Sequence, residues 1–282
     1  MAILRKIFDF FIFSSLFIAL CAALMVYQTY FLFLQKTINF HLQAFVFFAT
    51  ICSYNFHWML TPANKTASEI NSGIDRHKKF HFLFYLVSLF PVGWLFFYFS
   101  SYWLWFCVAA VLTFLYSAPK IAFKPFQWLK KIAIGKTIFL SFVWTYVTAI
   151  LPIIVEKSTF TTEILLYITG QFFFIFSLCI LFDYRDKQDD INEGIRSLVI
   201  YFNERGINML FFTAIILAAA SFILLALSAQ DSRNILVSLI PLGIVACLYN
   251  PAKKDFSDYM YYFVLDGMLM VPGILIWIMN RF

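Results

Sequence analysis

The sequence predicts an all-α integral membrane protein with nine transmembrane helices arranged as two pseudo-equivalent halves. The first observation is the composition: 62% of the 282 residues are hydrophobic and 13% are charged, whereas a soluble domain is about half apolar and a quarter charged. The second observation is a set of long apolar runs, and the third is an internal repeat. The net charge of +6 then reflects the basic cytoplasmic loops of a membrane protein and does not indicate a nucleic-acid partner.

Nine apolar runs are candidates for crossing the membrane, because a spanning helix needs roughly 20 mostly apolar residues. They are residues 7–34, 42–60, 80–99, 102–117, 133–155, 163–182, 207–228, 234–249 and 259–279. The fourth and eighth runs are short, which is tolerated where a following polar loop dips toward a cavity. The first run is longer than the roughly 7–15 apolar residues of a signal peptide, so we interpret it as the first transmembrane helix.

The distribution of Lys and Arg residues predicts the orientation. Of the 21 Lys and Arg residues, four fall on one side of the predicted membrane: Lys36, Lys157, Arg233 and Arg281. The others lie on the opposite side, which is therefore cytoplasmic, and in a bacterial-type cell (inner) membrane the N-terminus is inside and the C-terminus outside. Three long loops share the cytoplasmic side, at 61–79, 118–132 and 183–206. We therefore expect the functional site on this side, with ionisable residues at the ends of the spans.

Two short patterns occur twice in the chain, in the same order. The copies are Asn71–Ile74 with Asn192–Ile195, and Leu115–Lys120 with Leu248–Lys253. We interpret the chain as a single transmembrane domain, residues 1–282, formed by an internal duplication. The first half covers about 1–155 and the second about 156–282.

An acidic cluster follows the sixth apolar run. Asp183, Asp186 and Asp190 are spaced i, i+3, i+7, so on a helix they fall within roughly a 60° arc of one face. Carboxylates crowded near membrane depth are costly unless a cation lies between them. Oxygen ligands on one face suit Mg²⁺, which commonly bridges to substrate phosphates. The alternative is a solvated helix end in which Arg185 and Lys187 are the salt-bridge partners.

Polar residues of the cytoplasmic loops accompany these acids. Candidates for binding a phosphate group are Tyr116, Lys120, Arg196, Tyr249 and Lys253. Lys120 and Lys253 occupy matched positions after the repeated tyrosine, which favours a specific role for both. Basic groups around a carboxylate–Mg²⁺ site would form a cradle for a diphosphate. The alternative is that they only reflect the positive-inside bias.

At these residues the chain resembles the UbiA superfamily of intramembrane prenyltransferases. The most specific part of the resemblance is Asp183–Asp190 followed by Gly194–Leu198. The resemblance implies a central cavity, a Mg²⁺-dependent reaction, the three aspartates as catalytic metal ligands, and Arg185 as a substrate contact. It also implies that a prenyl group moves within the lipid bilayer from a prenyl diphosphate to a small-molecule acceptor, a lipid or quinone precursor. No obligate protein partner is implied.

The first half of the chain departs from the family pattern. A shift of 128 residues places Asn55 on Asp183, and it leaves no acid opposite the other two aspartates. We therefore expect one Mg²⁺ in place of two, with Asn55 as an additional oxygen ligand. His57 is a candidate phosphate contact, and the alternative is a capping or interface histidine. Two acids of the following loop are further candidate ligands, Glu69 and Asp75.

Three functions remain open from the sequence. The loss of the first acids fits an active transferase, and it also fits a non-catalytic membrane protein that binds a prenyl lipid. A transporter is the rival from another class, because duplicated bundles are common among transporters. Two observations argue against a transporter: both copies of the repeat place their motifs on the same side of the membrane, and the ionisable residues cluster at the ends of the spans. Serine hydrolysis is excluded, because the sequence contains no G-x-S-x-G segment and no Gly-rich phosphate loop.

Overall fold

The structure, a computed structural model, confirms the predicted all-helical class. It describes residues 2–61, 78–121, 123, 126, 135–159, 161–194, 197–228, 235–279 and 281. Over these residues the regular elements are helices, and no strand occurs among them.

The helices follow the predicted apolar runs in chain order. They are α1 (Ala2–Phe13), α2 (Leu16–Gln28), the π-helix η1 (Thr29–Leu34), α3 (Phe40–Leu60), α5 (Lys78–Tyr98), the 3₁₀-helix η2 (Ser100–Tyr102), α6 (Trp103–Ser117), the 3₁₀-helix η3 (Ala118–Lys120), α8 (Gly135–Thr145), the π-helix η5 (Tyr146–Ile150), α9 (Leu151–Val155), α10 (Thr162–Glu193), α11 (Leu198–Tyr201), α12 (Glu204–Ser228), α14 (Leu239–Ala252), the π-helix η6 (Met260–Leu265) and α15 (Val271–Met279).

Several of these segments are suited to crossing a membrane. Six are long and apolar enough: Leu16–Leu34, Lys78–Tyr98, Ser100–Lys120, Lys136–Val155, Thr162–Asn192 and Glu204–Ser228. In addition, α14 is a shorter apolar helix, α3 is helical throughout its predicted run, and the ninth run is divided between η6 and α15. The chain is therefore a multi-pass membrane protein, and nine crossings stay a prediction.

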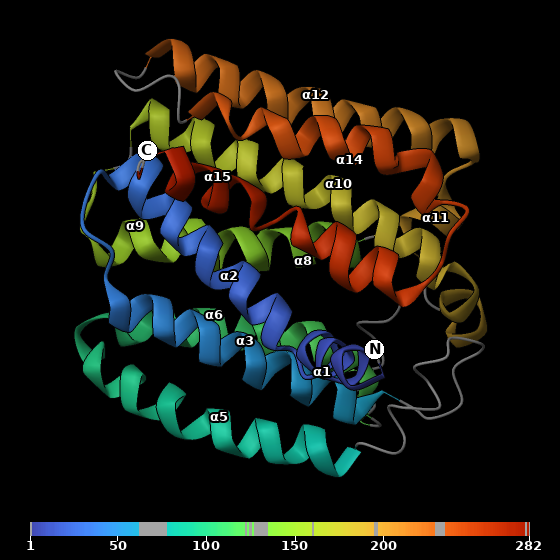
Figure 1. The fold of residues 1–282 in the computed structure, drawn as a ribbon, viewed down its shortest axis with the longest axis horizontal. Coiled ribbons are helices and arrows are strands. Elements are labelled where there is room, and N and C mark those ends of the chain that lie inside the picture. Colours follow the sequence, from blue (N-terminus) through green and yellow to red (C-terminus); the bar gives the residue numbers. More distant parts are fainter. Residues whose placement is uncertain are drawn as a thin grey trace.

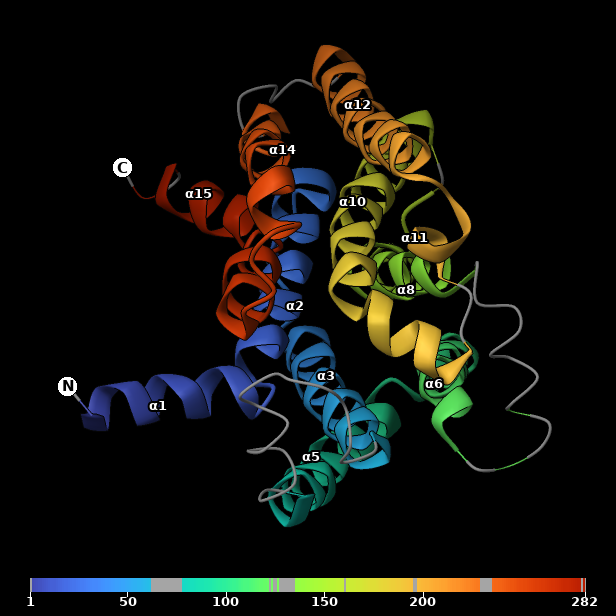
Figure 2. The same cartoon turned by 90° about the vertical axis from the view of Figure 1, so that its right-hand side faces the viewer.

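The first predicted span is wrong in one respect, because it is interrupted between α1 and α2. Ser15 has a φ angle of 69°, in the left-handed region that a helix of L-residues does not continue through. Figures 1 and 2 show the result: α2 runs along the bundle, whereas α1 projects from it at a steep angle. Ile3, Leu4 and Ile7 of α1 are 75%, 73% and 60% exposed, as expected for a helix that lies on a membrane surface.

The remaining helices surround a central space. The two most extensive helix–helix contacts are those of α3 with α5 and of α10 with α12. Figure 2 shows these two pairs on opposite sides of the bundle; α2 packs on α3 and α15, and α6 and α8 connect α3 to α10. The matched pairs α3–α5 and α10–α12 are what an internal duplication would produce, and the division into two halves stays a prediction.

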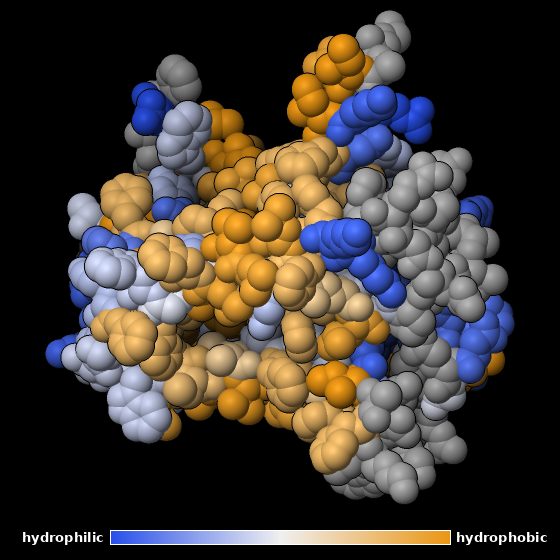
Figure 3. Space-filling view, turned by 90° about the horizontal axis from the view of Figure 1, so that it is seen from below, coloured by the Kyte–Doolittle hydropathy of each residue, from blue (hydrophilic) through white to orange (hydrophobic). Residues whose placement is uncertain are grey.

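The outer surface is apolar around its middle. Figure 3 shows apolar side chains across the centre of one face and hydrophilic side chains gathered toward its two ends. On α5, Val87, Phe90 and Trp94 are 63%, 79% and 69% exposed. A band of large exposed apolar side chains of this kind faces lipid in a membrane protein.

Helix α10 positions the acidic cluster. It continues to Glu193, beyond the predicted end of the sixth span at residue 182, so the acids lie on the helix itself. Gly194, with a φ angle of 69°, ends the helix, and its N–H donates to the carbonyl oxygens of Asp190 and Ile191. Figure 1 shows the N-terminus toward the same end of the bundle as α11 and this part of α10, and the C-terminus toward the other.

Candidate functional site

A cavity of about 1030 Å³ lies within the helix bundle. Its walls are mainly apolar and aromatic side chains of α3, α5, α6, α8 and α10, such as Phe45, Phe106, Trp144 and Ile175. Charged groups also line it, at the end where α10 carries its acids: Lys120, Lys136, Asp183, Arg185, Asp186, Asp189 and Asp258. An apolar chamber with a charged end is suited to a small amphiphilic molecule.

The predicted acidic face is present, and a lysine lies at its centre. Nζ of Lys136, at the start of α8, lies 3.9 Å from Oδ1 of Asp183 and 3.6 Å from Oδ2 of Asp186. It also lies 3.3 Å from Oδ1 of Asp190. The side chains of Asp183 and Asp190 are buried, and that of Asp186 is partly exposed. The ammonium group of Lys136 therefore offsets the repulsion between the three carboxylates, a role that the sequence analysis gave to a metal ion.

Two of the three acids face the cavity. Asp183 and Asp186 belong to its lining, and Oδ2 of Asp183 accepts a hydrogen bond of 2.5 Å from Oγ1 of Thr137. Asp190 lies against Lys136 and is not part of the lining. Within the described part of the chain, no three acids, histidines or cysteines converge as a metal centre. Mg²⁺ is commonly held by one or two carboxylates plus substrate phosphates, so Asp183 and Asp186 fit a metal that arrives with its substrate.

His57 and Lys120 form a second polar cluster, contributed by the first half. Nζ of Lys120 donates to Nε2 of His57 at 2.7 Å and to Oγ1 of Thr61 at 2.5 Å. Because Nε2 accepts, a neutral imidazole carries its proton on Nδ1, which lies 3.1 Å from Oγ of Ser117. The ring of His57 also stacks on Tyr116, with centroids 5.1 Å apart. All of these residues line the cavity, so three predicted phosphate contacts share it with the acids.

Arg185 lies between three aromatic rings and lines the cavity. Its guanidinium carbon is 4.5 Å, 5.1 Å and 5.2 Å from the ring centroids of Tyr262, Tyr261 and Phe182. Nε donates to Oδ1 of Asp186 at 3.0 Å. Nη1 is buried and has no hydrogen-bond partner among the described residues. A buried donor left unpaired is costly, and an anion in the cavity would satisfy it.

Asn55 does not reach the cavity, which corrects the prediction that it is a metal ligand. It is fully buried, and its Oδ1 lies 2.6 Å from Nδ1 of His81. Its Nδ2 donates to the carbonyl oxygens of Ile51 and Ser14, at 2.8 Å and 3.3 Å. These bonds join α3 to α5 and to the α1–α2 connection, so the amide has a structural role.

Tyr249 and Lys253, the second copy of the Tyr–Lys pattern, also lie outside the cavity lining, which corrects the prediction for both. Lys253 forms an ion pair with Glu204, and its Nζ lies 4.6 Å from the ring centroid of Tyr184. The hydroxyl of Tyr249 donates to Oδ1 of Asn208 at 2.5 Å. These contacts join α14 to α12 and α10. Matched sequence positions in the two halves therefore do not have matched surroundings.

Some predicted residues cannot be placed, and the sequence missed others. Glu69, Asp75 and Arg196 lie outside the described residues. From the sequence alone, Lys136 is only one of many basic residues on the cytoplasmic side, although it lies within the predicted span 133–155. Asp266 lies inside the ninth predicted span and lines the cavity, so the expectation of ionisable residues at span ends alone is wrong. The signal that could have identified Asp266 is that it is a single acid within an apolar run.

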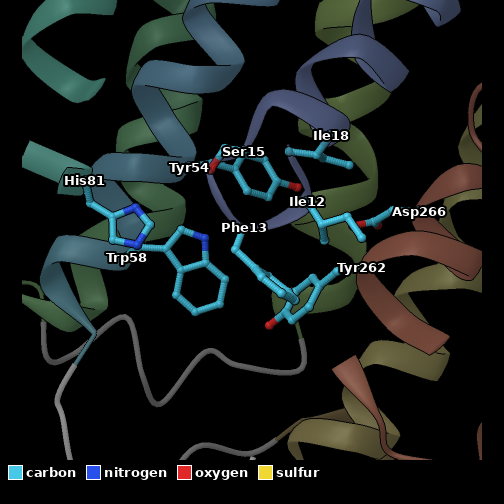
Figure 4. Close-up of a pocket in the computed structure, with 9 residues that line it drawn as sticks. All are labelled: Ile12, Phe13, Ser15, Ile18, Tyr54, Trp58, His81, Tyr262 and Asp266. Atoms are coloured by element: carbon cyan, nitrogen blue, oxygen red, sulfur yellow. The ribbon is translucent and has the colours of Figure 1, made fainter. Parts of the chain in front are cut away.

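A smaller pocket of about 30 Å³ adjoins the cavity beside Asp266. Figure 4 shows Phe13, from the end of α1, between Trp58 on one side and Tyr262 on the other. Four residues line both spaces: Tyr54, Trp58, Tyr262 and Asp266. The end of α1 therefore contributes to the side of the cavity at which Asp266 lies.

Comparison with known proteins identifies one family. The sequence model of the UbiA prenyltransferase family matches residues 70–258, which is more than half of the chain. No curated protein and no solved structure matches. The matched region includes Lys120, Lys136 and the acidic part of α10, and members of the family are membrane prenyltransferases that generally use divalent metals. The resemblance seen in the sequence is thereby confirmed, and the chain belongs to the UbiA prenyltransferase family.

Proposed function

We propose that this chain is a prenyltransferase that moves a prenyl group from a prenyl diphosphate to a lipid or quinone-precursor acceptor, in a Mg²⁺-dependent reaction. The observation that carries the proposal is one cavity of about 1030 Å³ with apolar walls and a charged end. A prenyl diphosphate has the same division, because a long apolar chain bears a charged head. The protein acts in a bacterial-type inner membrane, with its N-terminus in the cytoplasm.

The charged end binds the diphosphate head. Nη1 of Arg185 is a buried donor available to a phosphate oxygen, and Lys120 and Lys136 line the same cavity. Charge-assisted hydrogen bonds of this kind are about twice as strong as neutral ones. Tyr116 and His57 support Lys120 from one side, through the stacked rings and the Nε2 hydrogen bond.

Asp183 and Asp186 would hold Mg²⁺ together with oxygens of the substrate, and the ion would supply positive charge to the leaving diphosphate. The acidic face keeps affinity for a divalent ion, because its two resident cations, Lys136 and Arg185, offset only part of the charge of three carboxylates. Thr137 holds Asp183 in place through its 2.5 Å hydrogen bond.

The apolar walls receive the prenyl chain and exclude water from the reacting carbon. Departure of the diphosphate leaves an allylic cation, and the faces of aromatic rings attract a cation within about 6 Å of their centres. Aromatic side chains are frequent in the lining and include Trp144 and Phe182. Water that reached the cation would consume it, so apolar walls that keep water from the reacting carbon protect the transfer.

Binding of a prenyl lipid without turnover is the second candidate function. The observation that favours it is the lack of acids at the first-half positions that align with the three aspartates, while the first half brings His57 and Lys120 to the cavity. A transporter for a prenyl lipid is the third candidate. Apart from Asp266, the charged residues of the lining gather at one end of the bundle, which is unlike a site reached alternately from both sides.

One experiment separates these candidates. The purified protein in lipid nanodiscs is given radiolabelled geranylgeranyl diphosphate and membranes from a strain that lacks the gene, with Mg²⁺ or with EDTA. A transferase produces a labelled lipid and inorganic diphosphate only with Mg²⁺, and mass spectrometry finds the same lipid missing from the deletion strain. Saturable binding of the label without product identifies the non-catalytic protein instead. Movement of the label across sealed vesicles identifies a transporter.

Lys120 and Lys253 provide a matched pair for the head-group site. Lys120→Met is expected to weaken the binding of geranylgeranyl diphosphate about 10–100-fold, because a hydrogen bond to a charged group contributes about 1.5–3 kcal/mol. Lys253→Met removes an ion pair with Glu204 outside the cavity, so its dissociation constant should stay within about twofold of the wild type. Equal effects of the two substitutions in an equilibrium binding assay would contradict this placement of the head group.

A further inference from the structure

Asp266 is a buried carboxylate that the proposed reaction has not used. It is 8% exposed, lies within the last predicted span, and lines both the central cavity and the smaller pocket. Among the described residues, its carboxylate accepts no hydrogen bond and forms no ion pair. The cation whose field reaches it is Arg185, which is already bonded to Asp186. An unpaired carboxylate among apolar groups is costly within a membrane, and an ionisable residue at such a depth commonly has a functional role.

The backbone before Asp266 departs from a regular α-helix, as it also does at η1 and η5. The π-helix η6, Met260–Leu265, ends immediately before this residue. Single π-turns are rare and are frequently found at functional sites, because they change the direction of the side chains that follow. Figure 4 shows the side chain of Asp266 entering the smaller pocket from the side opposite to Trp58 and His81.

The position of Asp266 relative to the head-group site follows from Tyr262. The ring of Tyr262 covers the guanidinium of Arg185 at 4.5 Å, and Asp266 lies four residues later, about one helical turn farther from the charged end. In a prenyl diphosphate, the reacting carbon C1 is bonded directly to the diphosphate. If the head lies at Arg185 and Asp186, C1 therefore lies about one layer deeper, at the level of Asp266.

We propose that Asp266 is the catalytic base of the transfer, which rests on the proposed function. The C1–O bond breaks and its electron pair leaves with the diphosphate. An electron pair of the acceptor then forms the new bond to C1, and the proton that the acceptor loses moves to a carboxylate oxygen of Asp266. In the overall reaction, one prenyl diphosphate and one protic acceptor, such as a phenol, an alcohol or an aromatic C–H, are consumed. The products are the prenylated acceptor, diphosphate and a proton.

The charge of Asp266 suits both stages of this step. The allylic cation carries positive charge beside the carboxylate as the C1–O bond breaks, and the acceptor becomes acidic once its electron pair has joined C1. A general base within reach of the acceptor typically contributes about 10²–10⁴-fold to the rate. Asp183 and Asp186 are not suited to this task, because they face Lys136 and the bound head group.

The test uses Asp266→Asn in the complete protein in nanodiscs, with geranylgeranyl diphosphate and deletion-strain membranes as the source of acceptor. We expect kcat to fall about 10²–10⁴-fold. We also expect the dissociation constant of the unreactive analogue geranylgeranyl S-thiolodiphosphate to stay within about threefold, because the head-group contacts remain. The melting temperature should stay the same or rise, because an unpaired buried charge has been removed. Formate should restore part of the activity of Asp266→Ala by replacing the missing carboxylate.

The control is Glu156→Gln, which changes a carboxylate that is bound to Lys36 and Tyr30 near α9, away from the cavity lining. Its kcat should equal that of the wild type. A kcat of Asp266→Asn within threefold of the wild type, or an inactive Asp266→Ala that formate does not restore, overturns the role of Asp266. A wild type that forms no prenylated product overturns the proposed function itself, so the two failures are distinguishable.

Discussion

Asp183→Asn is expected to lower kcat for prenyl transfer about 10²–10³-fold, which is the usual cost of removing one preorganised group that stabilises transition-state charge. Asp183 is one of two carboxylates of the acidic face that line the cavity. Asparagine keeps the size of the side chain and an oxygen that accepts from Thr137, but it removes the negative charge. In initial-rate measurements, the Mg²⁺ concentration at half-maximal activity should rise in parallel, while the protein stays folded.

Asp190→Asn is the matched control, because Asp190 belongs to the same helix face but not to the cavity lining. Its carboxylate bonds Lys136, so its loss should change the stability more than the rate. We expect kcat to stay within about fivefold of the wild type. Equal losses of activity in Asp183→Asn and Asp190→Asn would show that all three aspartates act on the metal, as the spacing alone predicts, and would contradict the geometry.

Lys136→Met is expected to lower the free energy of unfolding by about 3–5 kcal/mol in the absence of divalent ions, because three carboxylates are left without their shared cation. Mg²⁺ should restore much of this loss by occupying the place of the ammonium group. The measurement is the melting temperature in detergent, with EDTA and with excess Mg²⁺. The wild type, which carries its own cation, should gain less from Mg²⁺ than the variant does.

Lys253→Met serves as the comparison for this effect. It removes an ion pair of Lys253 with Glu204, a residue with a largely exposed side chain, and such pairs contribute about 0–1 kcal/mol. Its melting temperature should be nearly that of the wild type and should respond to Mg²⁺ as the wild type does. If Lys136→Met were as stable as Lys253→Met and equally indifferent to Mg²⁺, the buried acidic cluster would not depend on its central cation.

The class of the fold and the acidic face were predictable because both depend on local patterns. A run of apolar residues determines a membrane helix wherever its neighbours lie, and the spacing of Asp183, Asp186 and Asp190 determines a common face once α10 is helical. The extension of α10 to Glu193 keeps that face intact beyond the predicted span. His57 and Lys120 line the same cavity as Asp183 and Asp186, and a head-group site formed by them stays a prediction.

The neighbours of each side chain were not predictable in the same way, because they depend on how the helices rotate and pack. Lys136 is distant in sequence from the acids that surround it, and the residue spacing in α8 and α10 does not predict that the two helices meet there. Asn55 aligns with Asp183, yet it faces His81 and the α1–α2 connection. Lys253 repeats the pattern of Lys120 but packs on Tyr184.

The length of α10 has a consequence for how a substrate reaches the site. From Ile164 to Phe182 the helix carries no charged residue, and this part is about 28 Å long at 1.5 Å per residue, close to the thickness of the hydrocarbon core of a bilayer. Asp183 therefore lies at the edge of the hydrocarbon core. Under the proposed function, a prenyl diphosphate whose head is bound at Asp183 and Asp186 would therefore keep its phosphates near the depth of the lipid head groups. Binding would then not require the charged head to cross the hydrocarbon core.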